Sequence, residues 1–191
     1  MLSIMKHRGP DSAGVLIDGE TRVGRDPEHL DVSNIKGKLA IGHTHLTITA
    51  SEEAVQPLTG CLGELALVHD GEIYNRQEIR NQLTGHHFRT ESSSEVTIHL
   101  IEEKYSRNLI EAVKASLPLL DGVYAFAIVR ENEIVVARDP VGVKPLYLGK
   151  DGEFVAFASE RKALWMIGVK NAQPLLPGGV ALLTERGRFI S

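Results

Sequence analysis

The segment at residues 65–75, LALVHDGEIYN, joins an apolar run to residues that could take part in catalysis. Residues 65–68 are all apolar, which is typical of a strand buried on both faces. Asp70 and Gly71 follow as a turn dipeptide, because glycine adopts positive φ at little cost. Such a turn can present backbone N–H groups to a developing oxyanion, but a plain connecting turn uses the same residues. The segment therefore predicts either an oxyanion site or a simple connection.

Histidines near this segment suggest a second kind of chemistry. His43 and His45 are two residues apart in a strand-like stretch, which places them on one face. Together with His69 and Asp70, and with His7 as a further donor, they offer enough imidazole and carboxylate groups for a zinc or nickel site. Their spacing is loose, and scattered histidines are more often surface or core residues. A metal-binding protein that uses His43, His45 and His69 is therefore an alternative, and the main expectation is no metal.

Length, charge and cysteine content limit the classes of protein to consider. A chain of 191 residues can bury one core, so we expect a single domain over residues 1–191. The formal net charge is −4 with both signs interspersed, which argues against nucleic acid as a partner. No apolar run is long enough for a membrane span or a signal peptide, and the lone Cys61 has no internal disulfide partner. We expect a cytoplasmic protein with no cofactor, no membrane association and no redox chemistry.

Turn and cap residues define the elements in the first half of the chain. Asp18 and Gly19 separate two short strand-like segments and predict a hairpin. Ser92 is a cap residue that begins a helix, and Pro118 ends another. The predicted elements are strands at 13–17, 21–24 and 39–48, and helices at 74–83, from 92 onward, and at 108–116.

The second half of the chain is rich in strands. Short apolar segments separated by turn residues predict an antiparallel meander, followed by a helix at 159–165 with Ser159 as its N-cap. Helices that are grouped between runs of strands indicate an α+β fold rather than a parallel βαβ sheet. The predicted strands lie at 123–129, 134–137, 146–148, 154–158 and 179–183.

Five segments, in this order, resemble the class II glutamine amidotransferase family. They are HRGPDSAG from His7, GHTHLTI from Gly42, LVHDGEIYN from Leu67, RDPVGVKPLY from Arg138 and FASE from Phe157. The resemblance covers nearly the whole chain. It is strongest to the amidotransferase domain that begins asparagine synthetases, and weaker to the phosphoribosylpyrophosphate and fructose-6-phosphate amidotransferases. It implies a four-layer αββα sandwich of the N-terminal-nucleophile type.

The resemblance also implies how glutamine would be attacked. The family's nucleophile is a cysteine at the first position of the mature chain, and its own α-amine can serve as the base. Position 1 is Met here, and the strand and most of the helix expected before His7 are absent from the sequence. We therefore expect a truncated first strand and no catalytic residue. Cys61 lies within the chain and Ser3 lies too near Arg8, so neither is expected to replace the nucleophile.

Three further family positions differ in this chain. His45 stands where the family has an arginine that holds the substrate carboxylate, and Ser93 stands where it has an aspartate that pairs with the substrate ammonium. Asp70 stands where the family has an asparagine that donates to the oxyanion, whereas an ionised carboxylate only accepts hydrogen bonds. The resemblance thus implies a remnant oxyanion site at Asp70 and Gly71. The remnant substrate pocket would consist of Arg8, His45 and Ser93.

Charged side chains in the glycine- and proline-rich segments also have a structural interpretation. In such turns, charged side chains commonly bond to nearby backbone groups and so fix the loop. This interpretation favours loop-bracing roles for Arg8, Asp11, Arg138, Asp139 and Lys144.

We therefore expect an amidotransferase-like domain that is catalytically degenerate and serves as a binding, regulatory or assembly subunit of an ammonia-using synthase. Its ligand would be a small molecule related to glutamine. The alternative is an active glutamine-hydrolysing domain of the asparagine or glutamate synthase type, whose nucleophilic Cys lies upstream of Met1. A missing first strand would leave an unpaired sheet edge, so we also expect that the chain self-associates into a homo-oligomer or docks on another subunit through residues 1–17 and the neighbouring strands.

Overall fold

The structure is a computed structural model that describes residues 1–47, 55–152, 154–184 and 189–190. Its centre is a six-stranded antiparallel sheet with the strand order β12-β11-β7-β6-β5-β4. The two longest strands, β5 (Ala66–Ile73) and β6 (Gly122–Arg130), pair along the whole of β5. The remaining strands are β4 (Leu58–Thr59), β7 (Glu133–Arg138), β11 (Val180–Leu183) and β12 (Phe189–Ile190).

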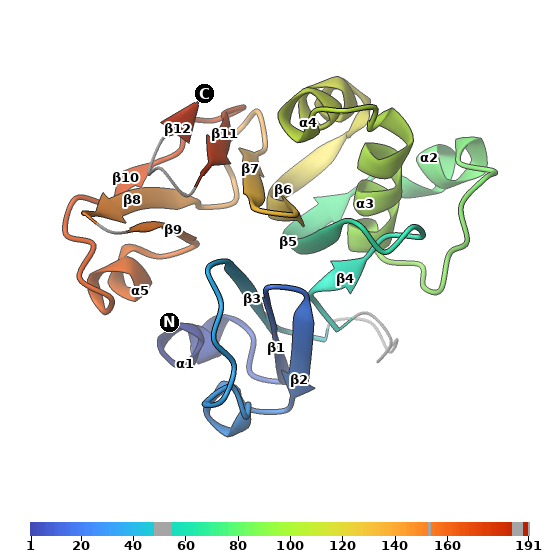
Figure 1. The fold of residues 1–191 in the computed structure, drawn as a ribbon. Coiled ribbons are helices and arrows are strands. Elements are labelled where there is room, and N and C mark those ends of the chain that lie inside the picture. Colours follow the sequence, from blue (N-terminus) through green and yellow to red (C-terminus); the bar gives the residue numbers. More distant parts are fainter. Residues whose placement is uncertain (48–54, 153, 185–188, 191) are drawn as a thin grey trace.

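Helices cover one face of this sheet (Figure 1). They are α2 (Arg76–Gln82), α3 (Ser93–Lys104), α4 (Leu109–Ser116) and the short 3₁₀ turn η4 (Leu117–Leu119). The side chains of Ser92 and Asn108 accept hydrogen bonds from backbone N–H groups in the first turns of α3 and α4, which fixes where these helices begin. Ile98 and Ile101 of α3 pack with Leu67 of β5 in a buried apolar core.

Two three-stranded sheets face the other side of the central sheet (Figure 1). One has the order β2-β1-β3, with β1 (Ser12–Ile17), β2 (Glu20–Gly24) and β3 (Ala40–His45). The other has the order β10-β8-β9, with β8 (Tyr147–Asp151), β9 (Phe154–Ala158) and β10 (Gln173–Pro174). Leu16, Ile41 and Leu148 from these sheets pack in a second core with Ala66 and Val68 of β5.

Short helices complete the molecule near its N-terminus. They are α1 (Leu2–Met5), the 3₁₀ turns η1 (Lys6–Arg8) and η2 (Pro27–His29), and α5 (Arg161–Trp165). Met5 of α1 packs with Ala163 and Leu164 of α5 in a third small core. No helix in the described part of the chain is both long and apolar enough to cross a membrane.

Several local predictions are confirmed. Residues 65–68 alternate between the two cores, Leu65 and Leu67 on the helix side and Ala66 and Val68 on the other, as a strand buried on both faces requires. Asp18 and Gly19 have φ values of 42° and 90°, which suit a tight hairpin turn between β1 and β2. The α+β class is also as predicted.

The predicted turn at Asp70 and Gly71 is wrong. Strand β5 continues through both residues, and Gly71 pairs with Tyr124 of β6. Gly71 has a φ of 146°, and a Cβ at this position would lie 2.0 Å from the Val123 carbonyl oxygen. Glycine is needed here because two strands approach closely in the middle of a sheet, so the residue marks tertiary packing rather than a chain reversal.

One further prediction needs correction. Helix α5 begins at Arg161 with Glu160 as its N-cap, so Ser159 does not cap it. Strand β1 pairs with β2 on one side and with β3 on the other, so residues 12–17 have no free edge, and the edges of that sheet belong to β2 and β3. Of the strand predicted at 39–48, β3 covers Ala40–His45, and Ile48 lies outside the described residues.

Candidate functional site

A cavity of about 1100 Å³ lies between the three sheets. Its walls include residues of η1, β3, β5 and β9 and the N-terminal end of α3. The five residues assigned above to remnant sites all line it, namely Arg8, His45, Asp70, Gly71 and Ser93. Residues far apart in the sequence are therefore brought to one chamber, and their roles toward a ligand stay a prediction.

Asp70 is held by two cations at the edge of this cavity. Its carboxylate oxygens accept hydrogen bonds from Lys144 Nζ at 2.7 Å and from Arg8 Nη2 at 2.9 Å. Burial alone would raise the pKa of Asp70, but the ammonium and guanidinium groups outweigh it and the pKa is lowered. The side chain is therefore an ionised acceptor with both oxygens already paired.

Arg8 also connects Asp70 to a second group of charged side chains around Glu160. Arg8 Nη1 lies 3.6 Å from Glu160 Oε1. Glu160 also contacts His7 at 2.8 Å and Lys162 at 3.0 Å. Arg8 thus bridges two carboxylates, and its charge is shared between them before any ligand enters.

Three histidines of the cavity are kept neutral by burial. Burial lowers the pKa of His43 to about 4 and that of His69 to about 4. It also lowers the pKa of His45, which nearby Asp11 offsets only in part. His43 Nδ1 and His69 Nε2 are buried and have no hydrogen-bond partner among the described residues. Neutral imidazoles with free ring nitrogens remain available to a polar ligand.

The structure does not support a metal site at His43, His45 and His69. Their side chains belong to two strands, and the rings of His43 and His45 are 5.9 Å apart between centroids. In the described part of the chain, only one group of three or more His, Cys, Asp or Glu side chains brings its ligand atoms within 4.8 Å of one another, and that group lies elsewhere.

Ser93 lines the cavity and also makes a hydrogen bond that stabilises the fold. Its hydroxyl accepts a hydrogen bond from the Ile73 N–H at 3.0 Å and so ties the start of α3 to the end of β5. The neighbouring Ser94 Oγ lies 3.4 Å from His69 Nδ1. The wall at the start of α3 is therefore built of hydroxyl groups and carries no charge from Ser93 or Ser94.

Gln56 is a cavity residue that the sequence did not single out. Its amide nitrogen donates to the His69 carbonyl at 3.0 Å, and its amide oxygen accepts from the His69 N–H. The side chain is 4% exposed and thus fixes the backbone of β5 next to Asp70 from inside the cavity. Only the fold places it there, since no motif contains it.

The RDPVGVKPLY segment braces a loop, as expected, but it also does more. Asp139 accepts hydrogen bonds from the N–H groups of Gly142, Val143 and Lys144. Arg138 donates to the carbonyls of Gly142 and Lys144 in the same turn and to that of Leu175 in a later segment. This rigid loop aims the Lys144 side chain at Asp70, which is 74 residues away in the sequence. Lys144 is therefore a residue of the cavity as well as of the loop.

Comparison with known proteins identifies one family and several relatives over most of the chain. The family model described as "Glutamine amidotransferase domain" matches residues 43–166. The amidophosphoribosyltransferase of Bacillus subtilis is 35% identical over 97% of this chain and 42% of its own length. A putative glutamine-hydrolysing asparagine synthetase of Methanocaldococcus jannaschii is 43% identical over 86% of this chain and 29% of its own length.

Solved structures of glutamine amidotransferases have a similar fold. The glutamine phosphoribosylpyrophosphate amidotransferase of B. subtilis, solved with ADP and GMP, superposes with a TM-score of 0.86 at 34% identity. It covers 99% of this chain, and this chain covers 44% of it. A predicted glutamine amidotransferase of Pseudomonas aeruginosa shares the fold alone, with a TM-score of 0.61 at 12% identity.

The fold is that of an amidotransferase domain of the N-terminal-nucleophile type. The chain belongs to the class II glutamine amidotransferase family. It spans less than half the length of the curated relatives named above.

Proposed function

We propose that this domain binds a small molecule related to glutamine in its cavity without hydrolysing it, and that it serves an ammonia-using synthase as a binding, regulatory or assembly domain. The observation that carries the proposal is the state of Asp70. At the position where the family has an oxyanion donor, this chain has an ionised carboxylate whose two oxygens are paired with Arg8 and Lys144.

The charge of Asp70 opposes amide hydrolysis. Attack on the glutamine amide develops negative charge on the carbonyl oxygen, and a catalytic site stabilises that charge with hydrogen-bond donors. A carboxylate at this place only accepts hydrogen bonds and repels the anion. Losing one such donor costs roughly 10²- to 10³-fold in rate, and a negative charge in its place costs more.

The groups that would hold the two ends of glutamine are weakened as well. The pKa of His45 is lowered by burial, so the ring is neutral near pH 7 and offers at most one hydrogen bond to a carboxylate. Ser93 offers a hydroxyl where an ammonium group would need a carboxylate, and this hydroxyl already accepts from Ile73. A ligand with fewer charges than free glutamine suits these walls better.

The test measures hydrolysis and binding in the same samples. Glutamate release from glutamine should stay at the uncatalysed background for the wild-type chain, and a cysteine-directed glutamine analogue should change nothing. Asp70→Asn should bind glutamine at least about tenfold more tightly, because Lys144 is then free for its carboxylate and Arg8 keeps only its longer contact with Glu160. Asp31→Asn, at an exposed position outside the cavity, is the matched control. Turnover that the analogue abolishes would overturn the proposal.

The second candidate is an active glutamine-hydrolysing domain of the asparagine or glutamate synthase type, with its nucleophilic Cys upstream of Met1. One observation favours it, since Met1 and Leu2 line the same cavity as Gly71. A version of the chain extended at its N-terminus with the upstream codons, assayed for glutamate release, tests it. Activity that requires an added cysteine would replace the first candidate with this one.

We also propose the finer architecture and the association implied by the family. The layering of helices, sheet, paired smaller sheets and helices supports a four-layer αββα sandwich. Self-association is proposed at the edges of β2 and β3, which neighbour residues 12–17 and are the outer strands of that sheet in the described part of the chain. Light scattering tests it, and a monomer at all concentrations would contradict it.

A further inference from the structure

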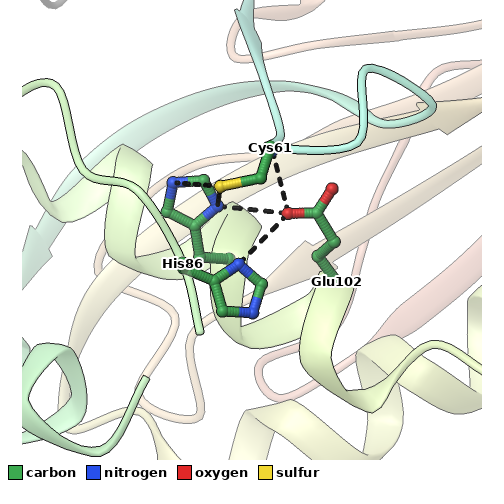
Figure 2. Close-up of side chains that lie close together, drawn as sticks. Cys61, His86 and Glu102 are labelled. Carbon is green, nitrogen blue, oxygen red and sulfur yellow. Dashed lines mark hydrogen bonds and ion pairs between the residues drawn. The ribbon is translucent and has the colours of Figure 1, made fainter. Parts of the chain in front are cut away.

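A group of four potential metal ligands lies away from the cavity. Cys61, His86, His99 and Glu102 bring one ligand atom each to within 4.8 Å of one another. Figure 2 shows the side chains of Cys61, His86 and Glu102 turned toward a common point. They come from three segments, namely the loop after β4, the loop before α3, and α3 itself, where His99 and Glu102 are three residues apart on one helix face.

Distances within the group match the edges of a tetrahedral zinc site. Cys61 Sγ lies 3.6 Å from His99 Nδ1, and Glu102 Oε2 lies 3.2 Å from His99 Nδ1 and 3.3 Å from His86 Nδ1. Zinc bonds of about 2.3 Å to sulfur and about 2.0–2.2 Å to nitrogen and oxygen give tetrahedron edges of roughly 3.3–3.6 Å. These three distances are close to such edges, and all four ligand atoms lie within 4.8 Å of one another.

The outer ring nitrogen of His86 is placed as a metal site requires. His86 Nε2 lies 3.2 Å from Glu103 Oε2, whereas His99 Nε2 lies 3.6 Å from Glu95 Oε1, beyond hydrogen-bond distance. In metal sites, the second nitrogen of a ligating imidazole almost always donates to a carboxylate, a carbonyl or water, which leaves the first nitrogen unprotonated toward the metal. His86 would therefore present a lone pair at Nδ1.

One ring nitrogen also lacks a partner. His86 Nδ1 is buried and makes no hydrogen bond among the described residues, although it lies near Glu102. An unprotonated His86 Nδ1 and the Glu102 carboxylate repel each other when nothing lies between them, whereas a divalent cation would bind both.

The remaining ligands are held by the backbone. Glu102 Oε2 accepts from the Cys61 N–H at 3.0 Å and Oε1 accepts from the Leu62 N–H at 2.9 Å, which fixes the carboxylate against the loop. The His87 N–H lies 3.2 Å from Cys61 Sγ, a donor that suits a thiolate. Gly60 permits this packing, because a Cβ there would lie 2.6 Å from Glu102 Oε1.

We propose that Cys61, His86, His99 and Glu102 bind one zinc ion in a closed, structural site. One thiolate, two imidazoles and one carboxylate form a donor set that suits tetrahedral Zn²⁺, and four protein ligands leave no open position for catalysis. The ion would tie the loop after β4 and the loop before α3 to the helix whose first turn lines the cavity. This zinc site does not depend on the function proposed for the cavity.

The test uses the 191-residue chain without a histidine tag. Calorimetric titration of metal-free protein with Zn²⁺ should give one ion per chain, and zinc should raise the melting temperature. Loading with Co²⁺ should produce a thiolate-to-cobalt charge-transfer band, which reports a bond to sulfur directly.

Variants separate this site from adventitious binding. Cys61→Ser, at an exposed position, should fold, lose the charge-transfer band and lose more than about 100-fold in zinc affinity, since even outer partners are worth 10- to 100-fold. His86→Ala should lose as much, while His29→Ala, an exposed histidine elsewhere, should match wild type. No zinc binding, no charge-transfer band, or equal affinity in Cys61→Ser and wild type would each overturn the proposal.

Discussion

Two regions of the molecule combine carboxylates with histidines, and they compensate charge in different ways. At the cavity, Asp70 is paired with the permanent cations Arg8 and Lys144, and the nearby imidazoles stay neutral and separate from it. At α3, the Glu102 carboxylate faces two imidazoles and a thiol. The charge of Asp70 is already balanced by an arginine and a lysine, so this carboxylate needs no metal ion. Glu102 instead faces imidazole and thiol groups that can ligate a metal, so a bound cation suits it.

The two regions also differ in how rigidly their glycines are enclosed. A Cβ on Gly71 would meet the backbone of β6, and a Cβ on Gly60 would meet only the end of the Glu102 side chain. Backbone in a paired sheet cannot move without breaking hydrogen bonds, while a side chain can rotate. The same substitution at the two positions should therefore give unequal effects.

Gly71→Ala should have the largest effect on stability. The new Cβ would lie 2.0 Å from Val123 O and 2.7 Å from Tyr124 Cα, in a backbone conformation that L-residues rarely adopt. We expect a loss of more than about 4 kcal/mol in the free energy of unfolding, measured by urea denaturation. Gly85→Ala is the control, because no atom lies within 4 Å of its Cβ, and it should change stability by less than about 0.5 kcal/mol. Equal effects in the two variants would contradict the packing described here.

Acid should destabilise the cavity through its neutral histidines. The pKa of His69 is lowered from 6.5 to about 4, mainly by burial, so between these pH values the unfolded chain binds a proton that the folded chain does not. Stability from this group is present above pH 6.5 and is lost as the pH falls toward 4. The loss should be on the order of 3 kcal/mol. Urea denaturation of wild type and His69→Asn across this range measures it, and parallel pH profiles would refute the assignment.

Local signals in the sequence specified much of the fold. Asp18-Gly19 and the caps Ser92 and Asn108 act within a few residues of themselves, so their elements could be placed in advance. Gly71 could not be interpreted correctly, because the strand that it must approach lies some fifty residues later in the chain. A glycine that permits close packing looks the same in sequence as a glycine in a turn.

The sites were predictable to different degrees. The family resemblance brought Arg8, Asp70 and Ser93 into one place, which the structure also does. The ion pair from Lys144 to Asp70 was missed because charge compensation across 74 residues has no spacing signal. The group around Cys61 was missed for a similar reason, since its ligands come from three segments and only His99 and Glu102 have helical spacing.

Removing one cation from Asp70 should have an intermediate effect. Lys144→Met keeps the length of the side chain but leaves Asp70 with Arg8 alone. Breaking a buried pair costs about 3–5 kcal/mol, but these side chains are 28% and 29% exposed, so we expect about 2 kcal/mol. The melting temperature relative to Lys150→Met, an exposed lysine of β8, measures the effect. If the two variants melt together, Lys144 does not hold Asp70 in solution.

Gly60→Ala should have the smallest effect on folding and the most informative effect on metal. The new Cβ would lie 2.6 Å from Glu102 Oε1, so the carboxylate must shift by a few tenths of an ångström against the Cys61 and Leu62 N–H groups that hold it, at a cost of about 1 kcal/mol. The shift also moves Oε2, which faces His86 and His99, away from the point where we propose zinc. Zinc affinity should therefore fall by about tenfold or more while the metal-free protein melts close to wild type. Gly85→Ala is again the control. Unchanged zinc affinity in Gly60→Ala would mean that Glu102 is not a ligand, and that its contacts with the loop serve packing alone.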